Sequence, residues 1–291
     1  MQRFALRISV VAALALAVFP AAARAAGDPQ LAALQVALAR HGFYAGPIDG
    51  SDGPATMAAV RKLQQRKGLP VDGVAGPKTL KALGKFARHP LGSRHLAPGA
   101  TGWDVAELQF ELAWHGFPSS TFDGIFGGHV TGALRRFQRW AGLPVVGVAG
   151  PQTVRALRAP IPRCPIALAW PLDAPVGDTF GPRGSRFHAG IDIVADMGTP
   201  VHAAASGRVT WVGVRPGWGL LVTLANAHDV RTMYAHLSRT YVSLGQKVET
   251  GQQLGLVGMT GDATGPHLHF EVRVRGAAVD PLSGLPPAPL G

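Results

Sequence analysis

The sequence predicts a multidomain protein, with two small all-α three-helix modules followed by an all-β antiparallel domain. The first observation is a repeat, because residues 41–83 align without a gap with residues 115–157, 74 positions further along. The second is that apolar residues within both copies have helical spacing. The third is that beyond about residue 170 the chain changes to short Val-, Leu- and Thr-rich segments separated by glycine-rich turns, which is typical of strands.

The first 26 residues predict a signal peptide. Arg3 and Arg7 precede an apolar stretch from Ile8 to Phe19, and the small residues around Ala23 and Ala25 suit a signal peptidase. The apolar stretch is shorter than the ~20 residues that a bilayer span needs. We therefore expect a secreted protein, in the periplasm, the cell wall or the medium, with no stable membrane anchor after cleavage.

Charge and cysteine content exclude several classes of protein. The net charge of +11 and pI near 10.8 favour acidic partners, which include nucleic acid, anionic membrane and anionic cell-wall polymer. The chain has no RNP motif, zinc-finger spacing or compact basic run, so we expect no nucleic-acid partner. Cys164 is the single cysteine, which rules out an intramolecular disulfide, and its proline-rich setting indicates a bystander thiol. We expect a monomer.

Each repeat has the boundary residues of three helices. The first helix ends at a His-Gly-Phe sequence and is followed by an Asp-Gly turn. Gly68 and Gly142 are predicted left-handed C-caps of the second helix, and Pro77 and Pro151 suit the first turn of the third. The two equivalent histidines, His41 and His115, are interpreted as helix C-terminal residues favoured by the helix dipole, and not as metal ligands.

The combination of the Asp-Gly turn, a helix containing Phe-Gln or Leu-Gln, Gly-Leu-Pro-x-x-Gly and Gly-Pro-x-Thr resembles the three-helix peptidoglycan-binding domain of bacterial wall hydrolases. The resemblance covers residues 30–84 and 103–158. It implies that both modules bind the carbohydrate or stem peptide of the wall and have no catalytic role.

The C-terminal segment GPHLHFEV (265–272) places two histidines on one strand face. Side chains alternate along a strand, so the apolar set faces the core and the polar set faces a groove. The apolar set is Leu268, Phe270, Val272 and Val274, and the polar set is His267, His269, Glu271 and Arg273.

Two further segments of this domain carry potential ligands. FHAGID supplies His188 and Asp192, and MYAHLS supplies His236, which the same alternation puts on the face of Tyr234 and Val230. A hydrolytic zinc site needs three protein ligands and one position open to water. Four histidines and one aspartate are too many for one ion, so some of the histidines must act on the water.

These segments, in the order FHAGID, YAHL and GPHLHFEV, with GTPVHAAASGRV and LGQKVETGQQLGLVGMTG between them, resemble the lysostaphin-type (LytM-like) zinc endopeptidases. Those are β-rich enzymes that cut peptide bonds in peptidoglycan, and the resemblance spans about residues 176–281. It implies that His188, Asp192 and His269 bind one Zn²⁺, while His236 and His267 are catalytic residues beside the water. Which of the two is the general base, and which steadies the oxyanion, stays open.

Three other residues, Arg183, Arg186 and Glu271, lie near the predicted ligands in the sequence. Some relatives have a tyrosine a few residues before the first ligand, where this chain has Arg183 and Arg186. Glu271 faces the groove by alternation, but a hydrogen bond behind a ligand or a solvated position is favoured over a catalytic role.

The sequence therefore predicts a secreted zinc metalloendopeptidase that hydrolyses peptidoglycan and is held on the wall by its tandem modules. The alternatives are a catalytically silent wall-binding protein or activator of another hydrolase, and a peptidase with a protein substrate. The expected boundaries are signal peptide 1–26, first module 27–85, linker 86–100, second module 101–158, Pro-rich linker 159–170, catalytic domain 171–284 and tail 285–291.

Overall fold

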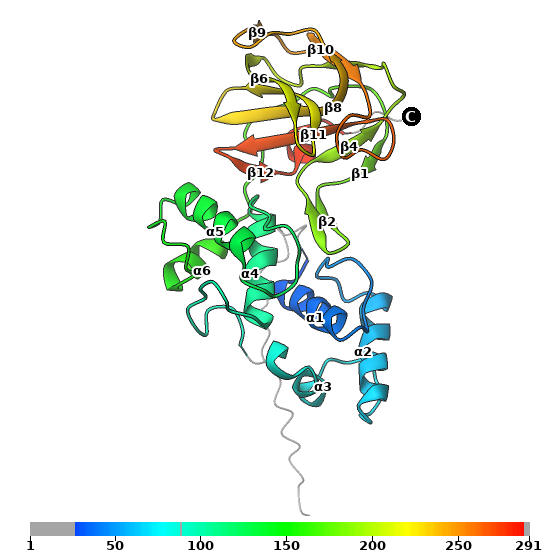
Figure 1. Ribbon diagram of the computed structural model, residues 1–291, viewed down its shortest axis with the longest axis vertical. Coiled ribbons are helices and arrows are strands. Elements are labelled where there is room, and N and C mark those ends of the chain that lie inside the picture. Colours follow the sequence, from blue (N-terminus) through cyan, green and yellow to red (C-terminus); the bar gives the residue numbers. More distant parts are fainter. Residues whose placement is uncertain (1–26, 88, 288–291) are drawn as a thin grey trace, which may run out of the picture.

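The computed structural model describes residues 27–87 and 89–287, and the predicted signal peptide lies outside them. The helices occupy one end of the molecule and the β-sheet the other (Figure 1). Among the described residues, no helix has the length and apolar content needed to cross a membrane.

The predicted pair of three-helix modules is confirmed. In both modules the third helix begins at the predicted proline, and Gly68 and Gly142 follow the second helix with left-handed φ angles of 63° and 68°. The helices are α1 (Pro29–Arg40), α2 (Pro54–Arg66), α3 (Pro77–Ala82), η1 (Gly84–Ala87), α4 (Trp103–Trp114), α5 (Gly128–Trp140) and α6 (Pro151–Leu157).

A buried glutamine fixes the turn after each of the first two helices of both modules. In the first of these turns the Gln35 side-chain amide donates to Asp49 Oδ1 (2.7 Å) and Thr56 Oγ1 (3.1 Å), while its Oε1 accepts from the Gly50 N–H (2.9 Å). One side chain thereby satisfies polar groups that burial would otherwise leave without partners. Gln64, Gln109 and Gln138 likewise accept from the N–H of a turn glycine through Oε1 and donate through the side-chain amide to oxygens of the turn.

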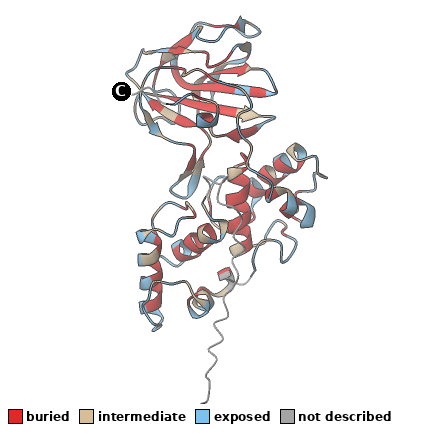
Figure 2. Cartoon of the chain, turned by 180° about the vertical axis from the view of Figure 1, so that it is seen from behind, coloured by how far each residue is buried: buried red, intermediate tan, exposed pale blue. Residues whose placement is uncertain are grey.

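The two modules share a core, although the repeat predicts separate units. Helices α1 and α4 pack together, and Ala106, Phe110 and Phe122 of the second module are buried in the core of the first. The segment predicted as a linker, 86–100, is also packed, because Leu96 is fully buried in the core of the second module. The two modules therefore form one helical unit, and the buried residues lie in its interior (Figure 2).

The C-terminal region is the predicted antiparallel β domain. Its main sheet has the order β1-β4-β11-β8-β7-β6-β9, with β10 bridging β5 and β8 and β12 on β11, and β2 and β3 form a separate hairpin. The strands are β1 (Val176–Asp178), β2 (Gly181–Arg183), β3 (Arg186–His188), β4 (Ile191–Val194), β5 (Pro200–His202), β6 (Gly207–Arg215), β7 (Gly219–Ala225), β8 (Val230–Thr240), β9 (Lys247–Val248), β10 (Gln253–Val257), β11 (His267–Val274) and β12 (Ala277–Val279), followed by η2 (Pro281–Ser283).

The alternation of side chains predicted for β11 is confirmed. The prediction that His236 lies on the same face of β8 as Tyr234 is wrong. Tyr234 and Leu237 both enter the core, and they pair with Val222 and Leu220, so β8 has one extra residue between them. This bulge holds His236 at a φ of +61° and turns its ring to the face opposite Tyr234. His236 thus joins the β11 histidines through the bulge and not through strand parity.

The second module contacts the sheet directly at Gly116. The Ala278 N–H of β12 donates to the Gly116 carbonyl (3.1 Å), and a Cβ at this position would collide with the Ala278 backbone. Gly116 also has a left-handed φ of +86°. Its repeat counterpart, Gly42, has a φ of +76°, but an added Cβ there meets no described atom within 4 Å.

We expect Gly116→Ala to destabilise the protein more than Gly42→Ala. Both substitutions add left-handed backbone strain of about 1–2 kcal/mol, but only the first also forces the module away from β12. Urea unfolding of the two variants beside the wild type gives the difference. Equal losses of unfolding free energy would show that the contact between module and sheet contributes nothing.

Candidate metal centre

Four strands bring the predicted site residues together. His188 ends β3, Asp192 lies in β4, His267 and His269 lie in β11, and His236 lies on the β8 bulge. The antiparallel pairing of β4 with β11 sets Asp192 opposite His269. The main sheet therefore fixes most of the site, while His188 comes from the separate β2–β3 hairpin.

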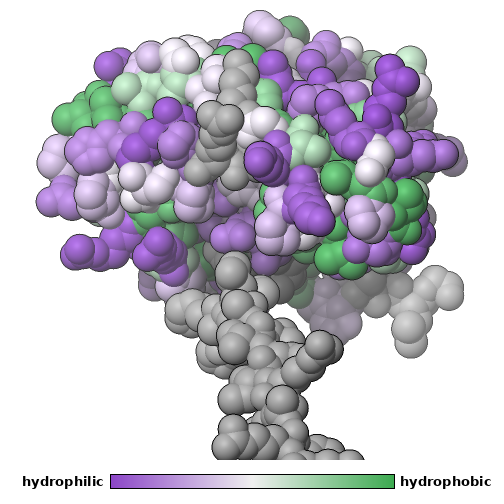
Figure 3. Space-filling model, turned by 90° about the horizontal axis from the view of Figure 1, so that it is seen from below, coloured by the Kyte–Doolittle hydropathy of each residue, from purple (hydrophilic) through white to green (hydrophobic). Residues whose placement is uncertain are grey.

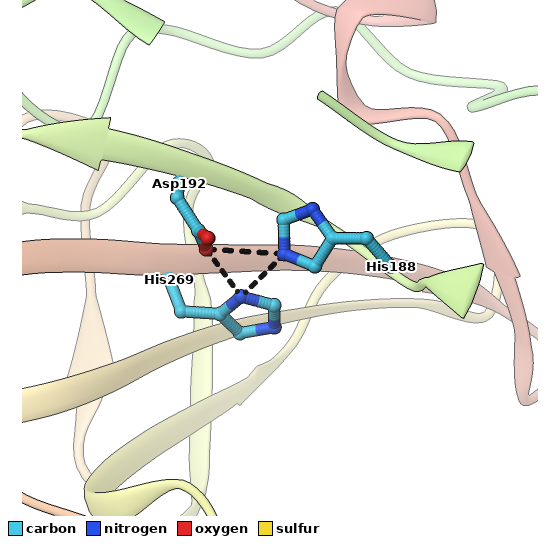
Figure 4. A group of neighbouring side chains, drawn as sticks. All are labelled: His188, Asp192 and His269. Atoms are coloured by element: carbon cyan, nitrogen blue, oxygen red, sulfur yellow. Dashed lines mark hydrogen bonds and ion pairs between the residues drawn. The ribbon is translucent and has the colours of Figure 1, made fainter. Parts of the chain in front are cut away.

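The three predicted metal ligands form one tight cluster (Figure 4). Asp192 Oδ1 lies 2.8 Å from His269 Nδ1 and 3.1 Å from His188 Nε2, and the two ring nitrogens are 3.0 Å apart. A tetrahedral zinc ion with ligands at about 2.0–2.1 Å holds its donor atoms roughly 3.3 Å apart. The cluster matches that spacing to within a few tenths of an ångström.

In His188 and His269, the ring nitrogen that points away from the cluster lies within hydrogen-bond distance of an oxygen atom. His188 Nδ1 lies 2.9 Å from the Thr179 carbonyl oxygen, and His269 Nε2 lies 3.2 Å from Glu271 Oε1. Each ring can donate an N–H to its oxygen, which leaves the lone pair of the other nitrogen directed at the cluster. Hydrogen bonds of this kind set the tautomer and orientation of a metal-binding histidine.

The charges around the cluster favour a cation at its centre. Burial alone would raise the pKa of Asp192, but the hydrogen bonds and charges of His188 and His269 hold that pKa well below its usual value. Burial also opposes the charge on His269, yet Asp192 and Glu271 raise its pKa to about 9. The surroundings of the cluster therefore stabilise a positive charge, whether a proton on His269 or a metal ion carries it.

His236 and His267 stand beside this cluster. Their ring centroids are 4.7 Å apart, and His236 lies 5.8 Å from the His269 ring. His236 Nδ1 is 2.7 Å from the Thr260 carbonyl oxygen, and His267 Nδ1 is 2.9 Å from that of Gly265. These bonds leave both Nε2 atoms available to a ligand. Burial and, to a smaller extent, the neighbouring imidazoles lower the pKa of His236, which favours the neutral ring that can accept a proton.

Two charged residues support the cluster and were not among the predicted site residues. Glu271 is buried, and its Oε2 accepts from Arg273 Nε (2.8 Å) and lies 2.7 Å from Arg273 Nη2. Although burial would raise the pKa of Glu271, Arg273 and His269 lower it to about 2. Arg183 Nη2 lies 2.6 Å from both Asp192 Oδ2 and Asp178 Oδ2. Strand alternation predicts that Glu271 lies on the same face of β11 as His267 and His269. Nothing in the sequence indicates the salt bridge between Arg183 of the hairpin and Asp192.

The repeat histidines have structural contacts. The buried His115 ring lies 2.9 Å from the Glu111 carbonyl oxygen and 3.2 Å from that of Ala159. His41 Nε2 lies 3.3 Å from the Leu83 carbonyl oxygen. His41 and His115 are the C-caps of α1 and α4, in agreement with their interpretation as helix-terminal, and their Nε2 atoms lie near carbonyl oxygens just after α3 and α6.

The donor set fits a divalent metal ion such as zinc. Two imidazole nitrogens and one carboxylate oxygen converge, and each imidazole has a hydrogen-bond acceptor at its other nitrogen. Two further imidazoles lie alongside the three donors. A β-sheet with this arrangement defines a metallopeptidase type of site.

Comparison with known families agrees with the fold. Residues 186–281 match the model of peptidase family M23, and residues 27–83 and 101–157 match that of a putative peptidoglycan binding domain. The C-terminal domain therefore belongs to peptidase family M23, and it follows two peptidoglycan-binding domains. The predicted resemblances are both confirmed.

Individual relatives match the C-terminal region. A DD-carboxypeptidase/endopeptidase, Mpg, from Neisseria meningitidis serogroup B is 46% identical over 104 residues, 36% of this chain and 24% of that protein. The peptidoglycan DD-endopeptidase ShyA of Vibrio cholerae is 42% identical over 95 residues, 33% of this chain and 22% of that protein. A zinc-containing peptidase from Vibrio cholerae, of known structure, is 34% identical with a TM-score of 0.39, over 42% of this chain and 41% of that one. The chain thus spans about a quarter of the length of these curated relatives.

We expect Glu271→Gln to weaken metal binding by about 10–100-fold, the usual effect of removing a hydrogen-bond partner behind a ligand. Glutamine keeps the shape of the side chain but removes the charge that faces His269 and Arg273. Competition with a chromophoric chelator measures the zinc dissociation constant. Glu249→Gln, at an exposed position before β10, is the control. An unchanged constant would show that Glu271 does not support His269.

Proposed function

We propose that this protein is a secreted zinc endopeptidase that hydrolyses peptide bonds in bacterial peptidoglycan. One observation carries the proposal: three donor atoms about 3 Å apart have two further imidazoles beside them, in a chain that also has two peptidoglycan-binding domains. ShyA is named as a peptidoglycan DD-endopeptidase, which agrees with this substrate, and the name of Mpg also describes an endopeptidase. A periplasmic or extracellular location follows from the substrate and from the predicted signal peptide.

In this proposal His188, Asp192 and His269 hold the zinc ion and leave one position open. When bound, zinc polarises the scissile carbonyl and lowers the pKa of a water molecule. The chain's own residues do the remaining work. The neutral imidazole of His236 or His267 accepts the proton of the attacking water at Nε2 and returns a proton to the leaving amine. The other imidazole, protonated at both ring nitrogens, donates a hydrogen bond from Nε2 to the developing oxyanion.

The modules hold the catalytic domain on its polymeric substrate. Two linked binding units raise the effective concentration of the catalytic site near the wall without any new contact at that site. The face of the molecule seen from the modules' end is largely hydrophilic, with smaller hydrophobic areas (Figure 3). The net charge of +11 adds attraction to the carboxylates and phosphates of the wall.

Digestion of purified peptidoglycan tests the proposal. We expect the zinc-loaded protein to release fragments with new amino termini, identified by mass spectrometry, and a chelator to stop their release until zinc is restored. Glycan strands should stay intact, because the site is suited to peptide bonds. If the protein sediments with the insoluble wall but no new amino terminus forms, the protein is a wall-binding protein without activity.

A further inference from the structure

The β2–β3 hairpin carries His188 but has no place in the main sheet. Among the residues that the structure describes, its two strands pair only with each other, from Gly181 opposite His188 to Arg183 opposite Arg186. An isolated two-stranded hairpin is at best marginally stable in water. The position of His188 therefore depends on what else the hairpin contacts.

The tip of the hairpin is bonded to both helical modules. The Gly184 carbonyl accepts a hydrogen bond from the Ile48 N–H (2.8 Å), and the Ser185 carbonyl accepts one from the Phe122 N–H (2.7 Å). Ile48 belongs to the first module and Phe122 to the second. The hairpin accordingly extends out of the β domain toward α1 and α4 (Figure 1).

The base of the hairpin packs on one aromatic residue of the second module. The ring of Trp114, the last residue of α4, contacts Phe187 edge to face at a centroid distance of 5.3 Å and Phe180 at 6.1 Å. Phe180 and Phe187 also contact each other at 4.9 Å. Aromatic contacts of this kind contribute about 0.5–1.5 kcal/mol each beyond the area they bury.

These two phenylalanines flank the hydrogen bond that orients the metal ligand. Phe180 follows Thr179, whose carbonyl oxygen lies 2.9 Å from His188 Nδ1, and Phe187 immediately precedes His188. A shift of either phenylalanine moves one partner of that bond. Trp114 touches both phenylalanines, so it fixes both ends together.

We propose that Trp114 is a positioning residue for the metal centre, acting through Phe180 and Phe187 on the hairpin that carries His188. The modules then do more than bind the wall, because their packing holds a metal ligand in place. This inference rests on the zinc site of the proposed function. A further contact of the hairpin besides the bonds at its tip, the ion pair of Arg183 with Asp178 and Asp192, involves a half-exposed guanidinium, and such pairs contribute little on their own.

The test uses the full-length protein and the variant Trp114→Ala. We expect the zinc dissociation constant, measured against a chromophoric chelator, to rise about tenfold. Hydrogen exchange of the amides between 181 and 188 should become faster in the metal-free protein. On a soluble peptide from peptidoglycan, kcat should fall while KM changes little. Trp114→Phe should restore most of the zinc affinity.

Trp140→Ala is the matched control. Trp140 is the last residue of α5 in the same module, and it packs on Phe137 and on Arg275 in the β11–β12 turn. The variant Trp140→Ala therefore removes a module tryptophan that contacts the β domain at a place other than the hairpin. We expect its zinc affinity and its hairpin exchange to equal those of the wild type.

A second variant, Phe180→Leu, removes the aromatic contact from the hairpin side and leaves α4 unchanged. If Trp114→Ala does not fold, as judged by circular dichroism, this variant decides alone. The inference is overturned if the folded variants keep wild-type zinc affinity and wild-type exchange at 181–188. A wild-type protein that binds no zinc contradicts the proposed function instead, and the exchange measurement still decides whether Trp114 holds the hairpin.

Discussion

Asp192→Ala is expected to remove stable zinc binding and to lower kcat/KM by on the order of 10³-fold or more, because a bound metal ion supplies several kcal/mol of transition-state stabilisation. The carboxylate is central to the cluster. Its Oδ1 contacts His188 and His269, the two predicted histidine ligands, and its Oδ2 contacts Arg183. Without it, His269 and Arg183 leave net positive charge at the place where a cation must bind.

Zinc content after dialysis, measured by mass spectrometry, checks this prediction together with activity on a soluble peptide. Asp196→Ala is the control, because Asp196 is an exposed carboxylate four residues further along in the same region. It should retain one zinc and wild-type turnover. If Asp192→Ala also retained one zinc per chain, the ligand set would have to be assigned to other residues.

Much of the fold and most of the site could be predicted because they depend on local patterns. Helix boundaries follow from residues such as Pro77 and Gly68, whose backbone preferences act at their own positions. The faces of β11 follow from strict alternation over eight residues, which puts His267 and His269 together. Neither feature needs knowledge of distant contacts.

His236 shows where such patterns fail. A single extra residue in β8 reverses the face of a side chain, and nothing near His236 in the sequence marks the bulge. The conformation depends on the neighbouring chain, since the His236 N–H donates to the Trp218 carbonyl (2.9 Å) and its ring bonds the Thr260 carbonyl oxygen. Long-range hydrogen bonds of this kind override the local parity argument.

The contact between the modules and the hairpin could not be predicted for the same reason. The repeat indicates two similar units, and it contains no information about which surfaces of those units meet. Trp114 and Phe187 are distant in the sequence and belong to different domains. Their packing depends on the shape of both domains once folded.

His236→Ala and His267→Ala are each expected to keep one zinc per chain and to lower kcat by about 10²–10⁴-fold, the range for loss of a group that transfers a proton or stabilises charge in the transition state. Neither ring belongs to the three-residue ligand cluster. Both rings have Nδ1 bonded to a carbonyl oxygen, and Nε2 of His267 lies 3.8 Å from Asp192 Oδ1. A variant that loses turnover but keeps its zinc shows that the substituted histidine is catalytic and is not a metal ligand.

His228→Ala is a control matched to His236→Ala in backbone conformation. His228 has a φ of 55° and His236 one of 61°, so alanine meets nearly the same left-handed strain at both positions. His228 is exposed in the turn between β7 and β8, whereas His236 is buried beside the cluster. A loss of turnover confined to His236→Ala therefore belongs to the imidazole and not to the backbone. If zinc were lost with turnover in that variant, His236 would be a ligand, and if turnover were kept, the proton would have to pass through His267.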